Sequence, residues 1–188
     1  MKSASPVSVS DTALQDAEWV RQAQQDPRAF EPLYRKYYGP VFRFVFKRVR
    51  SEADAQDIAQ QVFIKALQSL GRYRHRGYAF SAWLFRIALN EITDAARHNQ
   101  KLRAMHTGFA EMDALLDEVQ AEHASPQQLG AALNALSEED RTLVELRYFE
   151  QRKLKDIAVI LDWSESNAKV RMHRTLKRLR VALENPGL

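Results

Sequence analysis

Apolar residues recur along most of the chain at intervals of three and four, and no stretch alternates apolar and polar residues with a period of two. The first spacing is typical of amphipathic helices, whereas the second would have indicated strands. The 188 residues include only six glycines and six prolines. The pattern therefore predicts an all-α protein, with helices over about residues 12–25, 27–38, 41–50, 52–69, 81–99, 127–136, 138–149, 153–161 and 164–184.

Short motifs predict where several of these helices begin and end. Asp26–Pro27 has the form of an N-cap followed by a first-turn proline. Ser51–Asp54 and Ser137–Asp140 resemble capping boxes, in which the serine side chain accepts from the backbone N–H three residues on. Gly39–Pro40 predicts a break between two helices, and Gly71 predicts a helix end.

Two apolar stripes in the first half of the chain are predicted to face a core. Each stripe follows the spacing of one helix face. They comprise Leu14, Ala17 and Val20 in the first helix, and Ile58, Val62, Phe63 and Leu67 in the helix of residues 52–69.

The periodicity weakens in the middle of the chain, where the sequence becomes acidic. We therefore expect a loose tail, a first helical domain, a flexible acidic linker and a second small helical domain, over residues 1–10, 11–99, 100–124 and 125–185. Basic blocks in residues 35–50, 72–76 and 164–180 lie outside the linker. They indicate two nucleic-acid-facing modules, although solvated helix faces would have the same composition.

The composition argues against several classes of protein. The chain has no cysteine, which rules out disulfides, thiolate zinc sites and a cysteine nucleophile. No apolar run approaches the ~20 residues that cross a bilayer, and the first residues lack the apolar core of a secretory signal. There is no P-loop, glycine-rich phosphate loop or histidine–carboxylate metal spacing. We expect a soluble cytoplasmic protein that is not an enzyme and that holds no metal or cofactor.

The segment of residues 154–180 has the order of a helix-turn-helix: a short apolar-periodic helix, a turn at Trp163 and a second, basic helix. The first part of such a second helix meets base edges in the major groove. Lys169 and Arg174 could donate to guanine, and Arg171, Lys177 and Arg178 to phosphates. The alternative is an amphipathic surface helix in a bundle. The residues predicted to face the core are Ile157, Ala158, Leu161, Ala168, Met172, Leu176, Leu179 and Leu183.

Acidic and amide side chains line one face of the helix of residues 52–69. Asp54, Asp57, Gln60 and Gln61 lie across from its apolar stripe. Such a face can dock a basic partner helix through charge complementarity. Taken alone, the same face is equally consistent with a solvated helix surface.

A basic aromatic segment, residues 72–99, alternates arginines with aromatic residues. Single-stranded nucleic acid binds to this combination, because cations pair with its backbone and rings stack on unpaired bases. The alternative is that Phe80, Trp83 and Phe85 pack in the core, which we favour for Trp83 and Phe85. Tyr78 and the loop arginines are expected to be exposed.

In this order and spacing, the motifs resemble those of the extracytoplasmic-function (ECF) group of bacterial sigma-70 factors. The resemblance runs over about residues 16–183, apart from the linker. The first conserved segment of the family resembles RAFEPLYRKYYGPVFRFVFKRV, and its polymerase-binding helix resembles DAQDIAQQVFIKAL. Its W-L-x-R-I-A-x-N-x-x-x-D-x-x-R segment resembles FSAWLFRIALNEITDAARH, and its domain four resembles LSEEDRTLVELRYFE with the helix-turn-helix.

The resemblance implies an alternative specificity subunit that directs core RNA polymerase to a promoter set and assists DNA melting. Its first domain would bind the β′ clamp helices and the minus-ten element, and its second domain the minus-thirty-five element and the β flap. An anti-sigma factor is a further implied partner. The implied core-polymerase-binding residues are Asp54, Asp57, Gln60, Gln61 and Phe63. The implied minus-ten binding and melting residues are Arg72, Arg74, Arg76, Tyr78, Phe80, Trp83, Arg86, Asn90 and Arg97. The implied minus-thirty-five residues are Asn167, Lys169, Val170, Arg171, His173, Arg174, Lys177 and Arg178.

Some positions depart from the family pattern. Gln56 and Gln61 replace common acids, so the docking face carries less charge. Asp162 stands in the turn where a glycine is typical, and Asp tolerates a left-handed backbone better than most residues. Trp163 replaces an aliphatic residue and overfills the turn unless its neighbours adjust.

The main alternative is a stand-alone helix-turn-helix regulator whose N-terminal helical domain senses a signal or dimerises. A regulator that binds duplex DNA needs neither the polymerase-binding motif nor the basic aromatic segment. These two features therefore distinguish the hypotheses.

Overall fold

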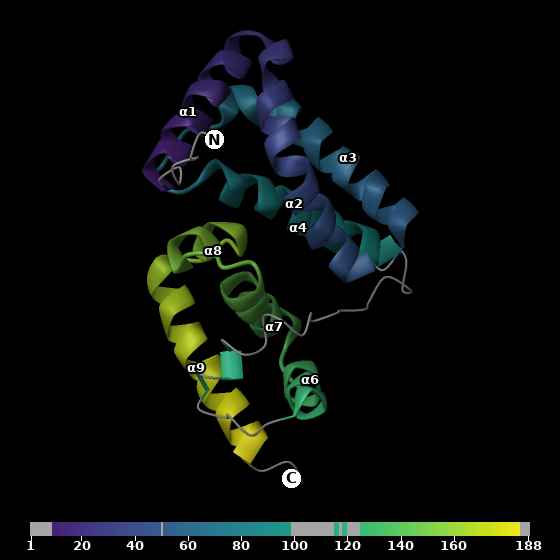
Figure 1. Cartoon of the computed structure of the whole chain (residues 1–188), viewed down its shortest axis with the longest axis vertical. Coiled ribbons are helices and arrows are strands. Elements are labelled where there is room, and N and C mark those ends of the chain that lie inside the picture. The colour runs from purple at the N-terminus through teal and green to yellow at the C-terminus, as the bar shows by residue number, and fades with distance from the viewer. Residues whose placement is uncertain (1–8, 50, 99–114, 117, 120–124, 185–188) are drawn as a thin grey trace, which may run out of the picture. The chain divides into compact units, whose positions relative to one another are not determined.

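The computed structural model describes residues 9–49, 51–98, 115–116, 118–119 and 125–184 of the chain (Figure 1). The chain divides into two compact units, Met1–Met105 and His106–Leu188. Within the described residues all regular structure is helical, which confirms the all-α prediction. None of the helices in this part of the chain is both long and apolar enough to span a bilayer.

The described residues of the first unit form four long helices and two short 3₁₀ turns. The N-caps at Asp26 and Ser51 form as predicted: their side chains accept from the backbone N–H groups of Arg28 and Asp54. Helices α3 and α4 begin at Glu52 and Phe80, each within one residue of the start that the sequence predicts. The elements are α1 Val9–Gln25, η1 Pro27–Phe30, α2 Glu31–Val49, α3 Glu52–Ser69, η2 Leu70–Arg72 and α4 Phe80–His98.

The predicted helix break at Gly39–Pro40 is wrong, because α2 continues through Pro40. A proline inside a helix removes one backbone hydrogen bond and costs about 3 kcal/mol. Here Tyr37, Val41 and Phe44 lie buried on either side of the proline and pack against the rest of the unit. Burial of one such side chain contributes about 1.5–3 kcal/mol, so packing on both sides outweighs the lost hydrogen bond.

The stripe predicted for the first helix is wrong at two of its three positions: Val20 is buried as predicted, but Leu14 is 72% exposed and Ala17 is exposed. The buried side of α1 instead includes Asp16, whose carboxylate accepts from Lys36 Nζ and from the Tyr37 hydroxyl at 2.5 Å each. A buried carboxylate is tolerated only when it is paired and hydrogen-bonded. Both partners come from α2, so this carboxylate ties α1 to α2.

The buried side of α3 differs in part from its predicted stripe. Val62 and Phe63 are buried as predicted, but Leu67 is 38% exposed and Ile58 is only half-buried. Their places in the core are taken by alanines, which let α3 lie close to α2 and α4. These alanines are Ala55, Ala59 and Ala66.

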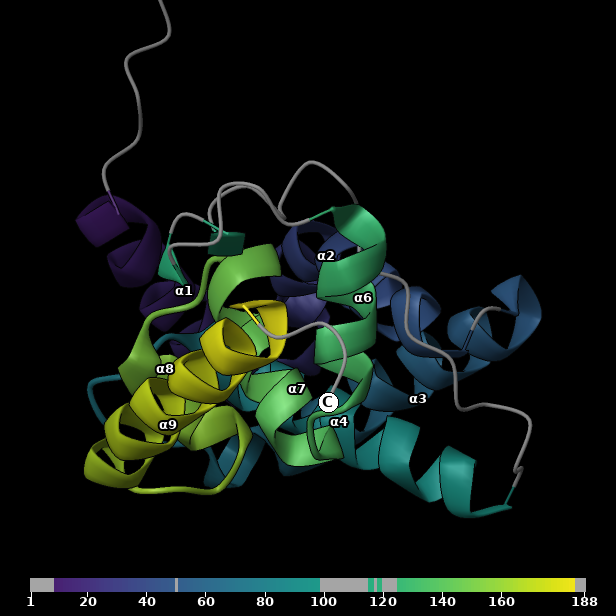
Figure 2. The same ribbon diagram turned by 90° about the horizontal axis from the view of Figure 1, so that it is seen from below.

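The second unit is a smaller helical bundle in which α9 contacts α6, α7 and α8 (Figures 1 and 2). The helix predicted over residues 138–149 is α-helical only to Val144 and continues as a π-helical turn. At the start of α7, Ser137 Oγ accepts from the Asp140 N–H. At the start of α6, Ser125 and Gln128 form a complete capping box. The elements are α6 Pro126–Asn134, α7 Glu138–Val144, the π-helical turn η5 Glu145–Phe149, α8 Leu154–Ile160 and α9 Glu165–Glu184.

Part of the predicted linker belongs to this second unit. Leu115 and Val119 are fully buried in its core, where Leu179 and Leu183 of α9 are also buried. The Arg180 Nε–H donates to the Val119 carbonyl at 3.0 Å and fixes the segment further. Two apolar residues inside an acidic stretch give only a weak helix pattern, which explains why the sequence assigned them to a linker. The rest of residues 100–124, apart from Leu116 and Glu118, lies outside the described residues.

Candidate functional site

The acidic and amide face predicted on α3 is exposed in the structure. Asp57, Gln60 and Gln61 are exposed, and Asp54 is half-buried in the first turn of the helix. Phe63, from the same predicted set, is only 5% exposed. The face therefore presents polar side chains to solvent, and Phe63 lies beneath it.

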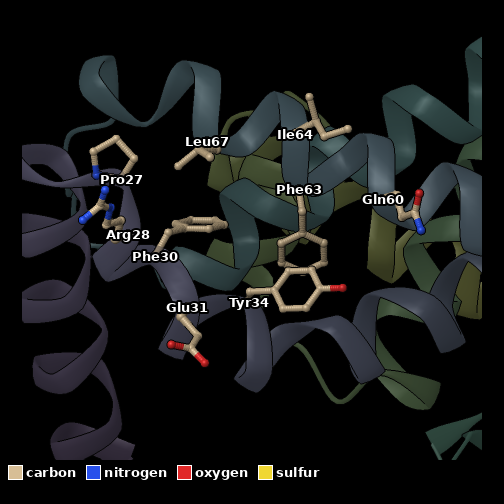
Figure 3. Close-up of a pocket in the computed structure, with 9 residues that line it drawn as sticks. All are labelled: Pro27, Arg28, Phe30, Glu31, Tyr34, Gln60, Phe63, Ile64 and Leu67. Atoms are coloured by element: carbon tan, nitrogen blue, oxygen red, sulfur yellow. The ribbon is translucent and has the colours of Figure 1, made fainter.

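An apolar groove of about 530 Å³ lies beside this face, between α3 on one side and η1 with α2 on the other (Figure 3). Figure 3 shows the rings of Phe30, Tyr34 and Phe63 turned toward one space, with Gln60 at one end of the groove. The Tyr34 and Phe63 ring centroids are 4.9 Å apart in an edge-to-face arrangement. The groove is lined by Pro27, Arg28, Phe30, Glu31, Tyr34, Gln60, Phe63, Ile64 and Leu67.

Sequence reasoning missed most of this groove. Tyr34, Ile64 and Leu67 are 39%, 48% and 38% exposed, which is unusual for side chains of their size and polarity. Ile64 and Leu67 are three residues apart and so lie on one helix face, next to Gln60 and Gln61. That spacing could have indicated an exposed apolar pair. Leu67, however, also fits the apolar stripe that is predicted to face the core.

The end of η2 and the loop that joins it to α4 carry the exposed arginines predicted for DNA binding. Arg72, Arg74 and Arg76 are all exposed. The Arg74 guanidinium folds back on the loop and donates to the Gly71 and Tyr73 carbonyls at 2.9 Å each. Gly77 has a φ of 79°, a conformation that glycine adopts without strain. Gly71, predicted to end the helix, lies in η2 without a positive φ.

A residue that the sequence did not indicate holds the start of this loop. The Gln24 side-chain amide donates to the carbonyls of Leu70 at 2.9 Å and Tyr73 at 3.0 Å. Gln24 lies at the end of α1, more than 40 positions earlier in the sequence. Such a contact has no local sequence signal, because only the tertiary fold brings the two segments together.

The aromatic residues of the basic aromatic segment divide between core and surface. Phe80 is 3% exposed, and its ring centroid lies 5.5 Å from that of Tyr73 and 5.8 Å from that of Tyr37. Phe85 is fully buried, as favoured from the sequence, whereas Trp83 and Tyr78 are half-buried. In this conformation Phe80 offers no ring face to a base, and Trp83 and Tyr78 are the aromatic side chains that reach solvent.

The remaining polar candidates on α4 have different surroundings. Asn90 and Arg97 are exposed. Arg97 Nη1 lies 3.1 Å from Asp94 Oδ1 in an i,i+3 ion pair. Arg86 is half-buried. An exposed i,i+3 pair contributes only a few tenths of a kcal/mol, so it leaves Arg97 available to a stronger anion.

In the second unit, α8, the turn and α9 form the predicted helix-turn-helix. Asp162 has a φ of 59°, the left-handed backbone that aspartate tolerates better than most residues. The Trp163 N–H donates to the Ala158 carbonyl at 2.8 Å, and Ser164 Oγ accepts from the Asn167 N–H at 3.1 Å. These bonds close the turn and begin α9.

The two faces of α9 lie as the periodicity predicts. Ala168, Met172, Leu179 and Leu183 are buried and Leu176 is half-buried. Asn167, Lys169, Val170, His173, Arg174, Lys177 and Arg178 are exposed, and Arg171 is half-buried.

Two of the predicted phosphate contacts are bonded to acids of α7. Arg171 Nη1 donates to Glu139 Oε2 at 2.5 Å, and its guanidinium lies 4.4 Å from the centroid of the Trp163 ring. Arg178 Nη1 donates at 2.8 Å to Asp140, a carboxylate that is almost fully buried. Trp163 is therefore accommodated by stacking against Arg171 and not by filling the core. Both arginines tie α9 to α7.

A weaker pair occurs at the start of α9. Lys169 Nζ lies 2.8 Å from Glu165 Oε1, and this hydrogen bond lowers the pKa of the Glu165 carboxyl below its ordinary value. Both side chains are more than half exposed. Lys169 can exchange this exposed carboxylate for another anion at little cost.

No cluster of three or more His, Asp or Glu side chains suited to a metal ion occurs among the described residues. The surfaces offer cations, amides and rings, which are groups that bind other macromolecules.

Comparison with known families gives two matches along the chain. Residues 33–102 match the model described as Sigma-70 region 2, and residues 127–179 match the model described as Sigma-70, region 4. The first match contains α3 and the basic aromatic segment, and the second contains the helix-turn-helix. A stand-alone regulator accounts for the second match but not for the first.

Two curated bacterial proteins illustrate the similarity. The ECF RNA polymerase sigma factor SigX of Bacillus subtilis is 29% identical over 163 residues, which cover 82% of this chain and 84% of that protein. The RNA polymerase sigma-H factor of Pseudomonas aeruginosa is 30% identical over 186 residues, which cover 92% of this chain and 96% of that protein.

Solved structures share the fold. CnrH, solved in complex with the cytosolic domain of CnrY, is 22% identical with a TM-score of 0.61, over 90% of this chain and 97% of that one. The sigma factor RpoE, solved with the anti-sigma factor NepR from Bartonella quintana, is 20% identical with a TM-score of 0.54, over 82% of this chain and 96% of that one.

Proposed function

Because the chain belongs to the ECF group of the bacterial sigma-70 family, we propose that its first unit binds core RNA polymerase and opens promoter DNA while its second unit reads the upstream promoter element. A sigma factor confers promoter specificity on RNA polymerase and is not itself an enzyme. The chain therefore works as a subunit that binds core polymerase and promoter DNA.

The observation that supports the polymerase contact is the exposed face of α3. Asp57, Gln60 and Gln61 offer one carboxylate and two amides to a partner helix, which for this family is the β′ clamp. The first turn also holds Asp54, whose position is fixed by the Ser51 cap. Complementary charge across such a face sets the register and rate of docking.

The groove beside this face would add apolar contact area to the polymerase interface. Ile64 and Leu67 project from the same helix as Gln60, so one partner helix can contact the polar face and the groove together. Phe63 forms the groove floor with Tyr34. Exposed apolar patches rimmed by polar residues are typical of protein interfaces.

Minus-ten binding would use the exposed arginines of the loop and the half-buried rings beside them. Arg72, Arg74 and Arg76 would pair with the strand backbone, and Tyr78 and Trp83 would stack on unpaired bases. Phe80 would support Trp83 from the core, their centroids being 5.5 Å apart. Arg86, Asn90 and Arg97 would extend this surface along α4.

Minus-thirty-five reading would use the middle of the outward face of α9. Asn167, Val170 and Arg174 face outward one turn apart, in the half of the helix that enters the major groove. Lys169, His173 and Lys177 would border them. Arg171 and Arg178 would hold the helix against α7 and contribute to DNA binding mainly through its orientation.

An anti-sigma factor is a proposed regulator, supported by the partner in the RpoE structure of the same fold. The proposed location is the cytoplasm, where bacterial RNA polymerase acts. The β flap is a further proposed contact of the second unit.

The deciding experiment is a titration of the labelled full-length chain with sigma-free core RNA polymerase in moderate salt and without DNA. We expect nanomolar binding for the wild type and a loss of at least about tenfold for Asp57→Lys, because like charges juxtaposed at an interface are repulsive. The matched control is Glu18→Lys, which makes the same charge change at another exposed position of the first unit. Equal losses for both variants, or none for Asp57→Lys, would contradict the assignment of this face.

A further inference from the structure

Val170 is an exposed apolar side chain in the middle of the outward face of α9. It is 48% exposed and is the sixth residue of the helix. Its neighbours one turn away on the same face are Asn167 and Arg174, both exposed. The chain thus places one branched aliphatic group among polar side chains, on the surface proposed to meet base edges.

The second unit gains little stability from a valine at this position. A β-branched residue is a weaker helix former than alanine or lysine, and Val170 leaves about half of its side chain in solvent. The exposed part of its methyl groups can gain further burial only against a bound partner. Single exposed apolar residues are common, so position and surroundings must decide whether a partner contacts it.

The partner proposed for this face has a single apolar feature on its base edges. In the major groove the bases present hydrogen-bond donors and acceptors, and thymine alone adds a C5-methyl group. The N-terminal half of the second helix of a helix-turn-helix reaches those edges. Val170 lies in that half, with an amide three residues before it and a guanidinium four residues after it.

We propose that Val170 is a specificity-determining residue of the second unit, which contacts the C5-methyl group of one thymine in the upstream promoter element. This inference rests on the proposed function of α9 as the DNA-reading helix. It goes further by naming the chemical group that one residue recognises.

The chain supplies an internal comparison in Val181. This residue is 51% exposed and follows Val170 by 11 positions, about three helical turns, so it lies on nearly the same face. At 1.5 Å per residue it is about 16 Å farther along the helix axis. A helix that enters the groove by its first turns leaves Val181 beyond the bases.

The test begins with a promoter identified by transcript mapping with the holoenzyme. Each thymidine of its upstream element is then replaced, one at a time, by deoxyuridine, which lacks only the methyl group. Holoenzyme affinity is measured for the wild type and for the variants Val170→Ala, Val181→Ala and Arg174→Ala. Thymidines of the downstream element, replaced in the same way, serve as positions outside the reach of α9.

We expect one upstream replacement to weaken wild-type binding by about three- to fivefold, the effect of losing one buried methyl group. In Val170→Ala the thymine-to-uracil ratio at that position should fall toward one. In Val181→Ala it should remain at the wild-type value.

Two results would overturn the proposal: no upstream thymine to which the wild type is sensitive, or a sensitivity that Val170→Ala leaves unchanged. If α9 did not read DNA, as the proposed function requires, the result would differ from both of these. Arg174→Ala would then bind every promoter duplex as well as the wild type does. Circular dichroism of each variant excludes loss of helix as the cause, and alanine is the best helix former.

Discussion

The two units present their proposed DNA-binding residues in different ways. In the first unit, Phe80 and Trp83 of the basic aromatic segment belong to the ring cluster that packs the domain, and Phe80 is 3% exposed. In the second unit, inward and outward residues of α9 separate by helix face, with Met172 buried and Arg174 exposed. A substitution in the aromatic segment can therefore abolish DNA opening by unfolding the domain, whereas one on the outward face of α9 tests recognition directly.

The largest effect is expected for Phe80→Ala, which tests whether this ring belongs to the core. Removing a buried phenylalanine costs about 3–5 kcal/mol of unfolding free energy. Amide hydrogen exchange should show that loss in α2 and α4, while α9 serves as an internal reference. The control is Phe46→Ala, at a ring that is 42% exposed, for which we expect under about 1 kcal/mol. A stable Phe80→Ala that fails only in promoter opening would instead make Phe80 a base-stacking residue.

The next effect concerns the ties between α7 and α9 in the second unit. Asp140→Ala removes a nearly buried carboxylate that accepts from Arg178, and hydrogen bonds to charged groups contribute about 1.5–3 kcal/mol. We expect faster amide exchange across α9 and no change in the first unit. Glu139→Ala is the matched comparison, because Glu139 is 63% exposed and its bond to Arg171 contributes less. Equal effects of the two changes would show that burial of the acid does not matter.

The features that the sequence predicts depend on residues close to one another in the sequence. Those that it misses depend on contacts between residues far apart in the sequence. The outward face of α9 follows from helical periodicity alone, and the caps at Ser51 and Ser137 follow from local capping motifs. Buried Asp16 could not be predicted, since its partners Lys36 and Tyr37 lie about 20 positions later. Local pattern thus predicts which side of a regular helix faces in, but not which polar group the fold can satisfy.

The same limit explains the errors at the candidate sites. Gly39–Pro40 has the local signature of a helix end, yet buried residues on both sides keep α2 continuous. Leu67 has the right spacing for the core but lines the groove, because small alanines fill the α3 contact. Leu115 and Val119 are too few to give a helical period, although both are fully buried.

A smaller effect should separate the cations of α9 into two groups. Lys177→Ala removes an exposed cation that is predicted to contact phosphate, and losing one phosphate contact reduces the slope of log affinity against log salt by about 0.9. Arg171→Ala should leave that slope unchanged, because its guanidinium is held by Glu139 and Trp163. The measurement is holoenzyme binding to one promoter at several salt concentrations. Equal slope changes would mean that Arg171 exchanges Glu139 for a phosphate when DNA binds.

The smallest effect at neutral pH is expected for Tyr73→Phe, at the start of the DNA-binding loop. Burial raises the pKa of the Tyr73 hydroxyl from 10.0 to about 12. Burial likewise raises the pKa of Tyr148 in the second unit to about 12. Between pH 10 and 12 the unfolded chain loses these protons while the folded units keep them, so each unit should lose stability as the pH rises through that range.

Tyr73→Phe should remove this pH dependence from the first unit and leave it in the second, and Tyr148→Phe should do the reverse. Near pH 8 neither change should cost more than about 1 kcal/mol, because the Tyr73 hydroxyl has no hydrogen-bond partner within the described part of the chain. The measurement is urea unfolding at pH 8 and pH 11, followed through Trp19 and Trp83 for the first unit and Trp163 for the second. If the first unit of Tyr73→Phe still weakens at pH 11 as the wild type does, the hydroxyl is hydrated in solution and the start of the loop is more open than the structure shows. The loop arginines would then move independently of the aromatic core. The two units would differ less in how closely their proposed DNA-binding residues are tied to the domain core.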